Sequence, residues 1–332
     1  MKKRFYITTS IAYVNAPPHM GHALELVQAD VIARYRRLMG DSVLFATGTD
    51  EHGIKIVRRA EELGKRPGEL VDENMEKFCA LREKLNLSWN SFIRTTDTGR
   101  HWPTVEKAWR AIYRRGDLYR KAYEGAYCVG HEAFITKKDY APDGTCALHK
   151  TKPEVLREEN WFFRISRYAP AIKKFLQSGA VKIVPETRKN EVLSLIAEGI
   201  EDVSFSRPRK NLQWGIPVPG DDTQTMYVWA DALLNYLSHV SGKEQMWWPP
   251  NLHVVGKDIL RFHALIWLGI LKALGKLPPR TIFVHGFITA RGEKMSKSLG
   301  NVIDPVELTK RFGVDAVRYY LLAEIPSTED GD

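Results

Sequence analysis

The chain has 332 residues, of which 44% are hydrophobic and 27% are charged. At roughly 100–200 residues per domain, this length predicts about two domains with sizeable cores, and the composition excludes general disorder. The longest apolar run, residues 264–271, is well short of the roughly 18 residues needed to cross a bilayer. We therefore expect no transmembrane helix and no membrane partner.

The charge balance and the cysteine count narrow the class of protein. There are 49 Lys and Arg against 40 Asp and Glu, a formal net charge of +9, which favours an anionic partner such as nucleic acid. A soluble basic protein without such a partner is the alternative. The three cysteines, Cys79, Cys128 and Cys146, are odd in number and too few for a disulfide framework, which favours a reducing, cytoplasmic location.

The first third of the chain alternates predicted strands and helices. Residues 4–14 are predicted as a buried strand that ends at the Asn-Ala-Pro-Pro turn, residues 15–18. A helix over residues 19–37, a strand over 43–47 and a helix over 54–63 follow. This order indicates a parallel sheet with crossover helices, the start of a doubly wound α/β fold.

The middle of the chain has a different texture. It contains short aromatic-rich strands and turns, with strands predicted at residues 119–127, 161–165 and 181–184. The alternation of helix and strand then resumes at residues 226–240, 253–256, 262–274 and 282–286. We therefore predict one Rossmann-like nucleotide-binding domain in two halves, split by an inserted domain. The predicted segments are 1–115 for the first half, 116–225 for the insertion, 226–287 for the second half and 288–332 for the remainder.

The segment His19-Met20-Gly21-His22 lies at the first junction of strand and helix. Its two imidazoles, three residues apart, fall on one face of the first helical turn, where backbone N–H groups and the helix dipole favour phosphate. Gly21 leaves room for a flat base to approach the backbone. The alternative is an ordinary helix start with incidental histidines, because a tetrapeptide alone is a weak signal.

A second segment, Lys294-Met295-Ser296-Lys297-Ser298, carries two lysines between two glycines late in the same predicted domain. Lysine is a compact charge that suits a departing phosphate group, and a mobile loop can engage it as charge develops. Taken alone, such a loop is usually a solvated surface.

In this order and separation, the two segments resemble the paired signatures of class I aminoacyl-tRNA synthetases, with Met20 where the family more often has isoleucine or leucine. Further segments resemble the methionyl-tRNA synthetases within that class, and they are residues 13–16, 48–53, 227–232, 256–259 and 318–320. The resemblance covers nearly the whole chain, and isoleucyl, leucyl, valyl and cysteinyl relatives match these segments less well. It implies a Rossmann-like catalytic fold split by a connective domain.

The resemblance also implies a reaction and a nucleotide site. Methionine would react with ATP, bound with Mg²⁺, to give methionyl-adenylate and pyrophosphate, and the aminoacyl group would then pass to the 3′ end of tRNA(Met). The implied catalytic residues are His19, His22, Lys294 and Lys297. The implied ATP site comprises His19, Gly21, His22, Gly256, Asp258, Lys294, Lys297 and Ser298. Such a displacement at phosphorus needs positioned reactants and charge stabilisation more than an acid–base pair.

Methionine requires a carboxylate for its ammonium group and a pocket that suits a thioether. Asp50 follows a predicted strand at the expected cleft and is the best ammonium partner. The resemblance implies a largely aromatic pocket made of Ile11, Tyr13, Trp229, Ala232, Tyr236, Phe262, His263 and Trp267. Sulfur packs favourably against aromatic edges. The alternative is that these side chains are plain core.

The predicted insertion holds two Cys-x-x-His pairs, Cys128 with His131 and Cys146 with His149. Two thiolates and two imidazoles at this spacing can close a tetrahedral zinc site. Relatives with a metal knuckle here more often have cysteine at the position of His131. The alternative is two free cysteines with two surface histidines.

Methionyl-tRNA synthetases usually continue into a helical domain that reads the anticodon. The resemblance therefore leads us to expect a catalytic part that makes the adenylate but binds and charges tRNA(Met) weakly. Two other functions stay open. A nucleotidyltransferase of the same superfamily would have little need of Asp50 and the aromatic pocket, and a catalytically silent fragment would bind RNA or a partner without consuming ATP. The sequence predicts no oligomeric state.

Overall fold

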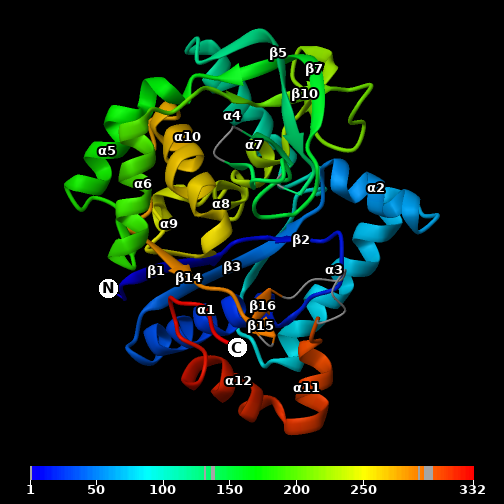
Figure 1. Cartoon of the computed structure of the whole chain (residues 1–332). Helices are drawn as coiled ribbons and strands as arrows, with labels where there is room; N and C mark the ends of the chain where they lie inside the picture. The colour runs from blue at the N-terminus through cyan, green and yellow to red at the C-terminus, as the bar shows by residue number, and fades with distance from the viewer. Residues whose placement is uncertain (1, 131, 136–138, 291, 295–301) are drawn as a thin grey trace.

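The computed structural model describes residues 2–130, 132–135, 139–290, 292–294 and 302–332. Its centre is a seven-stranded parallel sheet in which each described pair of neighbours runs in the same direction (Figure 1). The strands lie in the order β2 (Ala12–Tyr13), β3 (Ser42–Asp50), β1 (Arg4–Thr9), β13 (Leu252–Gly256), β14 (Thr281–His285) and β8 (Lys182–Val184), with β4 (Ser91–Arg94) also pairing with β3. The predicted parallel sheet is confirmed.

Helices cover both faces of this sheet, as the alternation of side chains along β13 shows. Val254 and Val255 are both fully buried, yet they belong to different core clusters, because successive residues of a strand point to opposite faces. The cluster around Val254 includes side chains from α1 (Met20–Leu38), α2 (Ile54–Glu62), α3 (Pro67–Lys84) and α12 (Val314–Ala323). The cluster around Val255 includes α4 (Trp102–Arg114), α5 (Ala169–Gln177), α6 (Glu186–Glu198) and α10 (Leu268–Ala273). The doubly wound α/β fold is therefore confirmed.

The helix predicted over residues 19–37 is present as α1, and its predicted apolar face is only partly buried. Leu24 and Val27 are fully buried against the sheet, whereas Val31 and Tyr35 are 39% and 57% exposed. The helical spacing of apolar residues thus located the helix correctly, while the packing of neighbouring elements decided how far its apolar face is covered.

Three predicted elements are interrupted in the structure. The strand predicted over residues 4–14 ends as β1 at Thr9 and resumes as β2 at Ala12, and between them the hydroxyl of Ser10 donates to Glu25 at 2.6 Å. The helix predicted over 226–240 is divided into α7 (Val228–Ala232) and α8 (Asn235–Ser238). The helix predicted over 262–274 begins as a π-helix, Phe262–Trp267, and continues as α10. Wider π-helical turns are frequent at functional sites.

The middle of the chain forms two small antiparallel sheets apart from the large one. The first has the order β6 (Ala133–Ile135), β5 (Leu118–Cys128), β7 (Glu154–Phe163) and β9 (Val203–Ser204). The second has the order β10 (Ser206–Pro208), β12 (Asp221–Met226) and β11 (Pro217–Val218). In Figure 1 these strands lie above the carboxyl end of β3, so the predicted change of texture corresponds to a separate antiparallel layer.

The strand predicted over residues 181–184 is present as β8. Its sequence position falls within residues 116–225, yet it pairs in parallel with β14 at the edge of the large sheet, and Ile183 is buried in the same cluster as Ile282. A three-residue strand carries no pattern that identifies its partner, so only the folded chain could assign it. The division into segments 1–115, 116–225, 226–287 and 288–332 otherwise stays a prediction.

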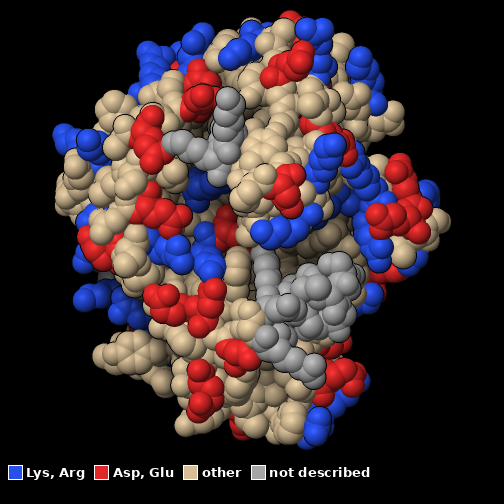
Figure 2. Space-filling model, in the orientation of Figure 1, with Lys and Arg blue, Asp and Glu red and all other residues tan. Residues whose placement is uncertain are grey.

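The last part of the chain packs beneath the sheet (Figure 1). A hairpin, β15 (Thr289–Ala290) with β16 (Glu293–Lys294), is followed by α11 (Pro305–Phe312) and α12. A short helix, α9 (Glu244–Trp247), precedes β13. None of the helices in the described ranges combines the length and apolarity needed to cross a membrane. Figure 2 shows basic and acidic side chains interspersed over the visible face rather than gathered in one field of a single sign.

Candidate active site

A cleft of about 430 Å³ opens at the carboxyl ends of the central strands. Its lining includes residues that follow β1, end β3, end β13 and end β14, together with the first turn of α1. Ligands of doubly wound folds bind at this edge of the sheet. The residues of the predicted ATP and methionine sites that line the cleft are Ile11, Tyr13, His19, Gly21, His22, Asp50, Trp229, Ala232, Tyr236, Gly256, Asp258 and His263. The structure therefore brings most of the two predicted sites into one cavity.

At the α1 end of the cleft, the two histidines cap the helix reciprocally. Nδ1 of His19 accepts a hydrogen bond from the backbone N–H of Gly21 at 3.1 Å, and Nδ1 of His22 accepts one from the N–H of His19 at 3.2 Å. A neutral ring that accepts at Nδ1 carries its proton at Nε2. The spacing of three residues thus satisfies helix N–H groups and fixes each ring with Nε2–H as a donor.

Two neighbouring histidines at this end of the cleft, His22 and His285, have pKa values shifted in opposite directions. Burial, followed by the proximity of His19 and His285, holds the pKa of His22 well below its usual range. Burial alone would also lower the pKa of His285, but the hydrogen bond to Glu25 at 3.0 Å and the charge of Glu25, together with the Gly286 carbonyl and the charge of Asp258, outweigh burial and raise it. His22 is therefore a neutral donor, and protonation is favoured at His285.

Two glycines keep this end of the cleft open. A Cβ at Gly21 would lie 2.9 Å from Cε1 of His19, and a Cβ at Gly256 would lie 2.8 Å from a carboxylate oxygen of Asp258. Side chains there would displace the groups predicted to meet a nucleotide. The backbone of Lys294 lies in β16, whereas Lys297 and Ser298 fall outside the described residues.

Asp50, the last residue of β3, is buried at the other end of the cleft with one oxygen unsatisfied. Among the described residues, its Oδ1 has no hydrogen-bond partner, and the side chain is only 6% exposed. Burial, followed by the nearby carboxylates of Asp231 and Glu132, raises the pKa of Asp50 well above its ordinary value. A buried carboxylate oxygen without a hydrogen bond is costly at neutral pH, and pairing with a cationic group would offset this cost.

Aromatic rings form one wall beside Asp50. Trp229 stacks on Phe262 with ring centroids 4.0 Å apart and nearly parallel planes. The hydroxyl of Tyr236 lies 2.7 Å from Nε2 of His263, whose Nδ1 faces the carbonyl of Ile259, so Tyr236 donates and His263 accepts. These contacts fix the rings before any ligand enters.

Two of the predicted aromatic residues do not line the cleft. Phe262 supports Trp229 from behind, and Trp267 is fully buried and donates from its indole N–H to His253 at 3.2 Å. Their periodicity within one helical segment could not separate the ring that faces a ligand from the ring that supports it.

Several polar groups at the cleft carried no recognisable sequence signal. Glu132 accepts hydrogen bonds from the hydroxyl of Tyr13 at 2.8 Å and from the backbone N–H of Lys55 at 2.6 Å. Its carboxylate occupies the space where a Cβ at Gly53 would lie, at 2.3 Å. At the α1 end, the carboxylate of Glu25 likewise forms hydrogen bonds with two groups, the hydroxyl of Ser10 and Nε2 of His285. Sequence separations of 15 to 260 residues in these contacts explain why no local pattern revealed them.

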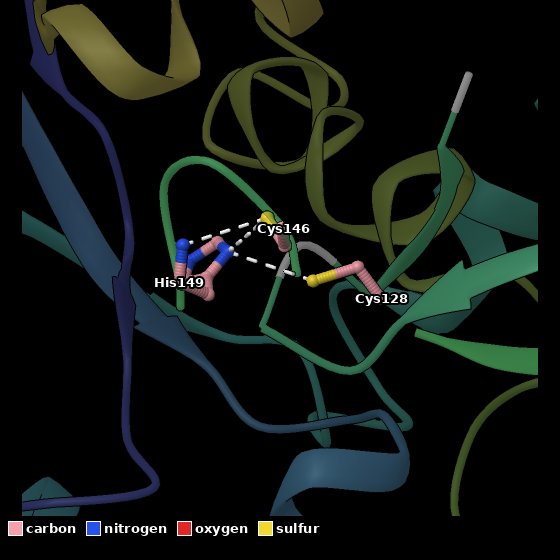
Figure 3. Close-up of side chains that lie close together, drawn as sticks. All are labelled: Cys128, Cys146 and His149. Atoms are coloured by element: carbon pink, nitrogen blue, oxygen red, sulfur yellow. Dashed lines mark hydrogen bonds between the residues drawn. The ribbon is translucent and has the colours of Figure 1, made fainter. Parts of the chain in front are cut away.

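A third group of predicted residues gathers at the rim of the cleft. The thiols of Cys128 and Cys146 each lie 3.6 Å from Nδ1 of His149 (Figure 3), and these ligand atoms fall within 4.8 Å of one another. Ligands of tetrahedral zinc, with bonds of about 2.3 Å to sulfur and about 2.0–2.1 Å to nitrogen, are separated by about 3.6 Å. The donor set and spacing therefore fit zinc. His131, the predicted fourth ligand, falls outside the described residues.

Comparison with known proteins identifies the family. Residues 5–146 and 140–332 match the model of the class I tRNA synthetases (M). The chain therefore belongs to the class I tRNA synthetase family. It is 45% identical to the methionine--tRNA ligase of Nostoc sp., over 100% of this chain and 64% of that protein. It is 43% identical to the chloroplastic/mitochondrial methionine--tRNA ligase of Arabidopsis thaliana, over 99% of this chain and 54% of that protein.

A solved structure agrees with these sequence comparisons. The Mycobacterium tuberculosis methionyl-tRNA synthetase in complex with methionyl-adenylate superposes with a TM-score of 0.94 and 43% identity, over 99% of this chain and 66% of that one. The chain thus spans between about half and two thirds of the length of these relatives.

We predict that Asp50→Asn stabilises the protein without ligand. A carboxyl group whose pKa is raised on folding stabilises the fold only at low pH, and this contribution is lost as pH rises from about 4 through the raised pKa. The variant should therefore be more stable than the parent at pH 7, by about 1–3 kcal/mol. Thermal unfolding from pH 4 to 8 measures this, and a less stable Asp50→Asn protein at pH 7 would contradict it.

Proposed function

We propose that this chain activates methionine with ATP to give methionyl-adenylate and pyrophosphate. The observation that carries the proposal is the buried, unpaired oxygen of Asp50 in the same cleft as the capped N-terminus of α1. One end of this cavity suits an ammonium group and the other suits phosphates. Methionine and ATP together present both groups.

In this proposal Asp50 binds the ammonium group, and the adjacent aromatic wall receives the thioether. The side chains of Tyr13, Trp229 and Tyr236 line the cleft together with Asp50. Aromatic edges favour sulfur, and the fixed rings offer a defined shape to an unbranched side chain. Methionine bound in this way would point its carboxylate away from Asp50, since two negative groups repel each other.

At the other end, the Nε2–H groups of His19 and His22 would donate to the phosphates of ATP. A methionine carboxylate oxygen attacks the α-phosphorus while the bond to the pyrophosphate oxygen breaks, so no proton has to be removed from either reactant. The neutral His22 and the helix N-terminus would stabilise charge on the phosphates. Lys294, Lys297 and the Mg²⁺ that accompanies ATP would neutralise the departing pyrophosphate.

The second half of the proposed reaction transfers the methionyl group to the 3′ end of tRNA(Met). The names of the relatives, methionine--tRNA ligases, support this partner, and the formal charge of +9 is compatible with a polyanion. We also propose a cytoplasmic location, which the absence of a disulfide among the three described cysteines supports, and zinc held by Cys128, Cys146, His149 and His131.

Amino-acid-dependent ATP–pyrophosphate exchange, without tRNA, tests the proposed activity. We expect exchange with methionine and not with leucine, isoleucine or valine, because the aromatic wall favours a thioether and its fixed shape suits an unbranched side chain. Asp50→Asn should abolish the exchange, whereas Asp222→Asn, an exposed substitution on β12, should leave it unchanged. Exchange with leucine as well as methionine would contradict the pocket. No exchange with any amino acid, from folded protein, would favour a nucleotidyltransferase or a silent binding fragment.

His22→Ala and Lys297→Ala test the nucleotide end. Each should slow adenylate formation about 100-fold or more, because preorganised donors act mainly on the transition state, while the affinity for methionine stays within about twofold. Single-turnover formation of the adenylate gives the rate, and the change in tryptophan fluorescence with methionine gives the affinity. Unchanged adenylation in both variants would refute these roles.

Metal analysis of protein purified without a histidine tag tests the zinc site. A closed tetrahedral site should hold about one zinc per chain. Cys146→Ser should lose most of the metal, and Cys79→Ser is the matched control because Cys79 lies on α3 outside the cluster. Less than about half an equivalent in the parent protein, or equal loss in the two variants, would count against the site.

A further inference from the structure

The segment that follows α12 returns to the nucleotide end of the cleft. In Figure 1 the C-terminus lies between the hairpin β15–β16 and α12. The side chain of Gln28, on α1, donates a hydrogen bond to the carbonyl of Ser327. Residues 326–332 therefore cross from the helical layer to the edge of the cleft, and we call them the return segment.

The return segment pairs with the backbone that leaves β14. The N–H of Gly331 donates to the carbonyl of Phe287 at 3.0 Å, and the N–H of Thr289 donates to the carbonyl of Gly331 at 2.7 Å. The approach is so close that a Cβ at Gly286 would lie 2.1 Å from the carbonyl oxygen of Glu329. Because residues 286–288 line the cleft, the return segment lies directly behind its wall.

Asp330 links this wall to Lys257, which stands between Gly256 and Asp258 of the predicted nucleotide site. One of its oxygens accepts from the backbone N–H of Phe287 at 2.9 Å, and the other accepts from Nζ of Lys257 at 2.6 Å. The same ammonium lies 4.4 Å from the centre of the Phe287 ring. Lys257 stands between Gly256 and Asp258, both at the cleft, so its ion pair fixes the turn that presents them.

Asp332 fixes the hairpin that carries Lys294. Its Oδ1 accepts from the hydroxyl of Thr289 at 2.7 Å and from the backbone N–H of Gly292 at 2.9 Å. These bonds join the start of β15 to the turn that precedes β16. A carboxylate that accepts two hydrogen bonds across a two-residue hairpin determines where its second strand emerges.

We propose that Asp330 and Asp332 are positioning residues for the nucleotide, acting through Lys257 and through the hairpin β15–β16. This inference rests on the proposed adenylation for its kinetic consequence. At the methionine end, Asp50, Trp229 and Tyr236 make no hydrogen bond with the return segment among the residues that the structure describes, and they are held by other elements. The return segment therefore affects the two substrates unequally.

Substitution of Asp330 by Asn and by Glu tests the role. Asn keeps the size and can still accept from Phe287 but loses the ion pair, whereas Glu retains the charge. We expect Asp330→Asn to raise the KM for ATP about fivefold, the size expected for a partly exposed ion pair, with the KM for methionine within about twofold. Asp330→Glu should recover part of the ATP effect, and Asp222→Asn should change neither KM. An unchanged KM for ATP, or equal increases for both substrates, would overturn the inference.

Hydrogen exchange supplies a measurement that does not depend on activity. The amides of Phe287, Thr289 and Gly292 all donate to the return segment. In the doubly substituted protein Asp330→Asn, Asp332→Asn, the peptide covering residues 286–294 should exchange faster, while β13 is unchanged. Unchanged exchange in that peptide would overturn the proposed hold on the hairpin. If the parent protein shows no ATP–pyrophosphate exchange but the double substitution still speeds amide exchange at residues 286–294, the proposed adenylation is rejected. The proposed effect of the return segment on the hairpin is then still supported.

Discussion

The burial of the Asp50 carboxylate with an unsatisfied oxygen is the constraint on which the rest of the site depends. Such a group destabilises the folded chain at neutral pH unless a cation pairs with it. The surrounding structure tolerates it because β3, which ends at Asp50, is held by β1 and β2 along one edge and by β4 along the other. The rigid sheet keeps the carboxylate in place, and a substrate ammonium would offset the cost of burying it.

A second buried carboxylate behind Asp50 is fully satisfied, in contrast. Asp231 accepts from His52 at 2.6 Å and from His101 at 2.7 Å. Burial alone would raise the pKa of Asp231, but the two imidazoles outweigh it and lower the pKa. Because α7, α4 and the residues after β3 meet at this carboxylate, the network ties together the elements around Asp50. The remaining negative charge of Asp231 in turn disfavours ionisation of Asp50 until a cation arrives.

The cleft is therefore electrostatically polarised along its length. Its Asp50 end is acidic, and its other end carries the N-terminus of α1 and the imidazole of His285, for which protonation is favoured. A pair of reactants with an ammonium group and phosphates would align along this axis before any bond changes. Glu132, contributed by the small antiparallel layer, closes the acidic end through Tyr13 and the backbone of Lys55, so the inserted strands take part in the cavity.

The sequence by itself determined the parallel sheet, the helix after the first turn and most residues at the cleft. Local patterns suffice for these features, because the alternation of apolar residues sets an element, and His19 and His22 act within a single helical turn. Asp50 and most residues of the aromatic wall could also be predicted from local sequence, because short segments around them resemble those of the family.

The tertiary structure alone decided which of these residues face the cavity and what holds them. It assigned β8 to the large sheet, placed Phe262 and Trp267 behind the wall, and brought Glu132 to Tyr13 and Asp330 to Lys257 across 119 and 73 residues. Each of these contacts depends on the packing of elements far apart in the chain, and neither periodicity nor motif spacing encodes such a distance. The chain therefore specified its chemistry locally, whereas the geometry that supports this chemistry arose only when the layers were packed together.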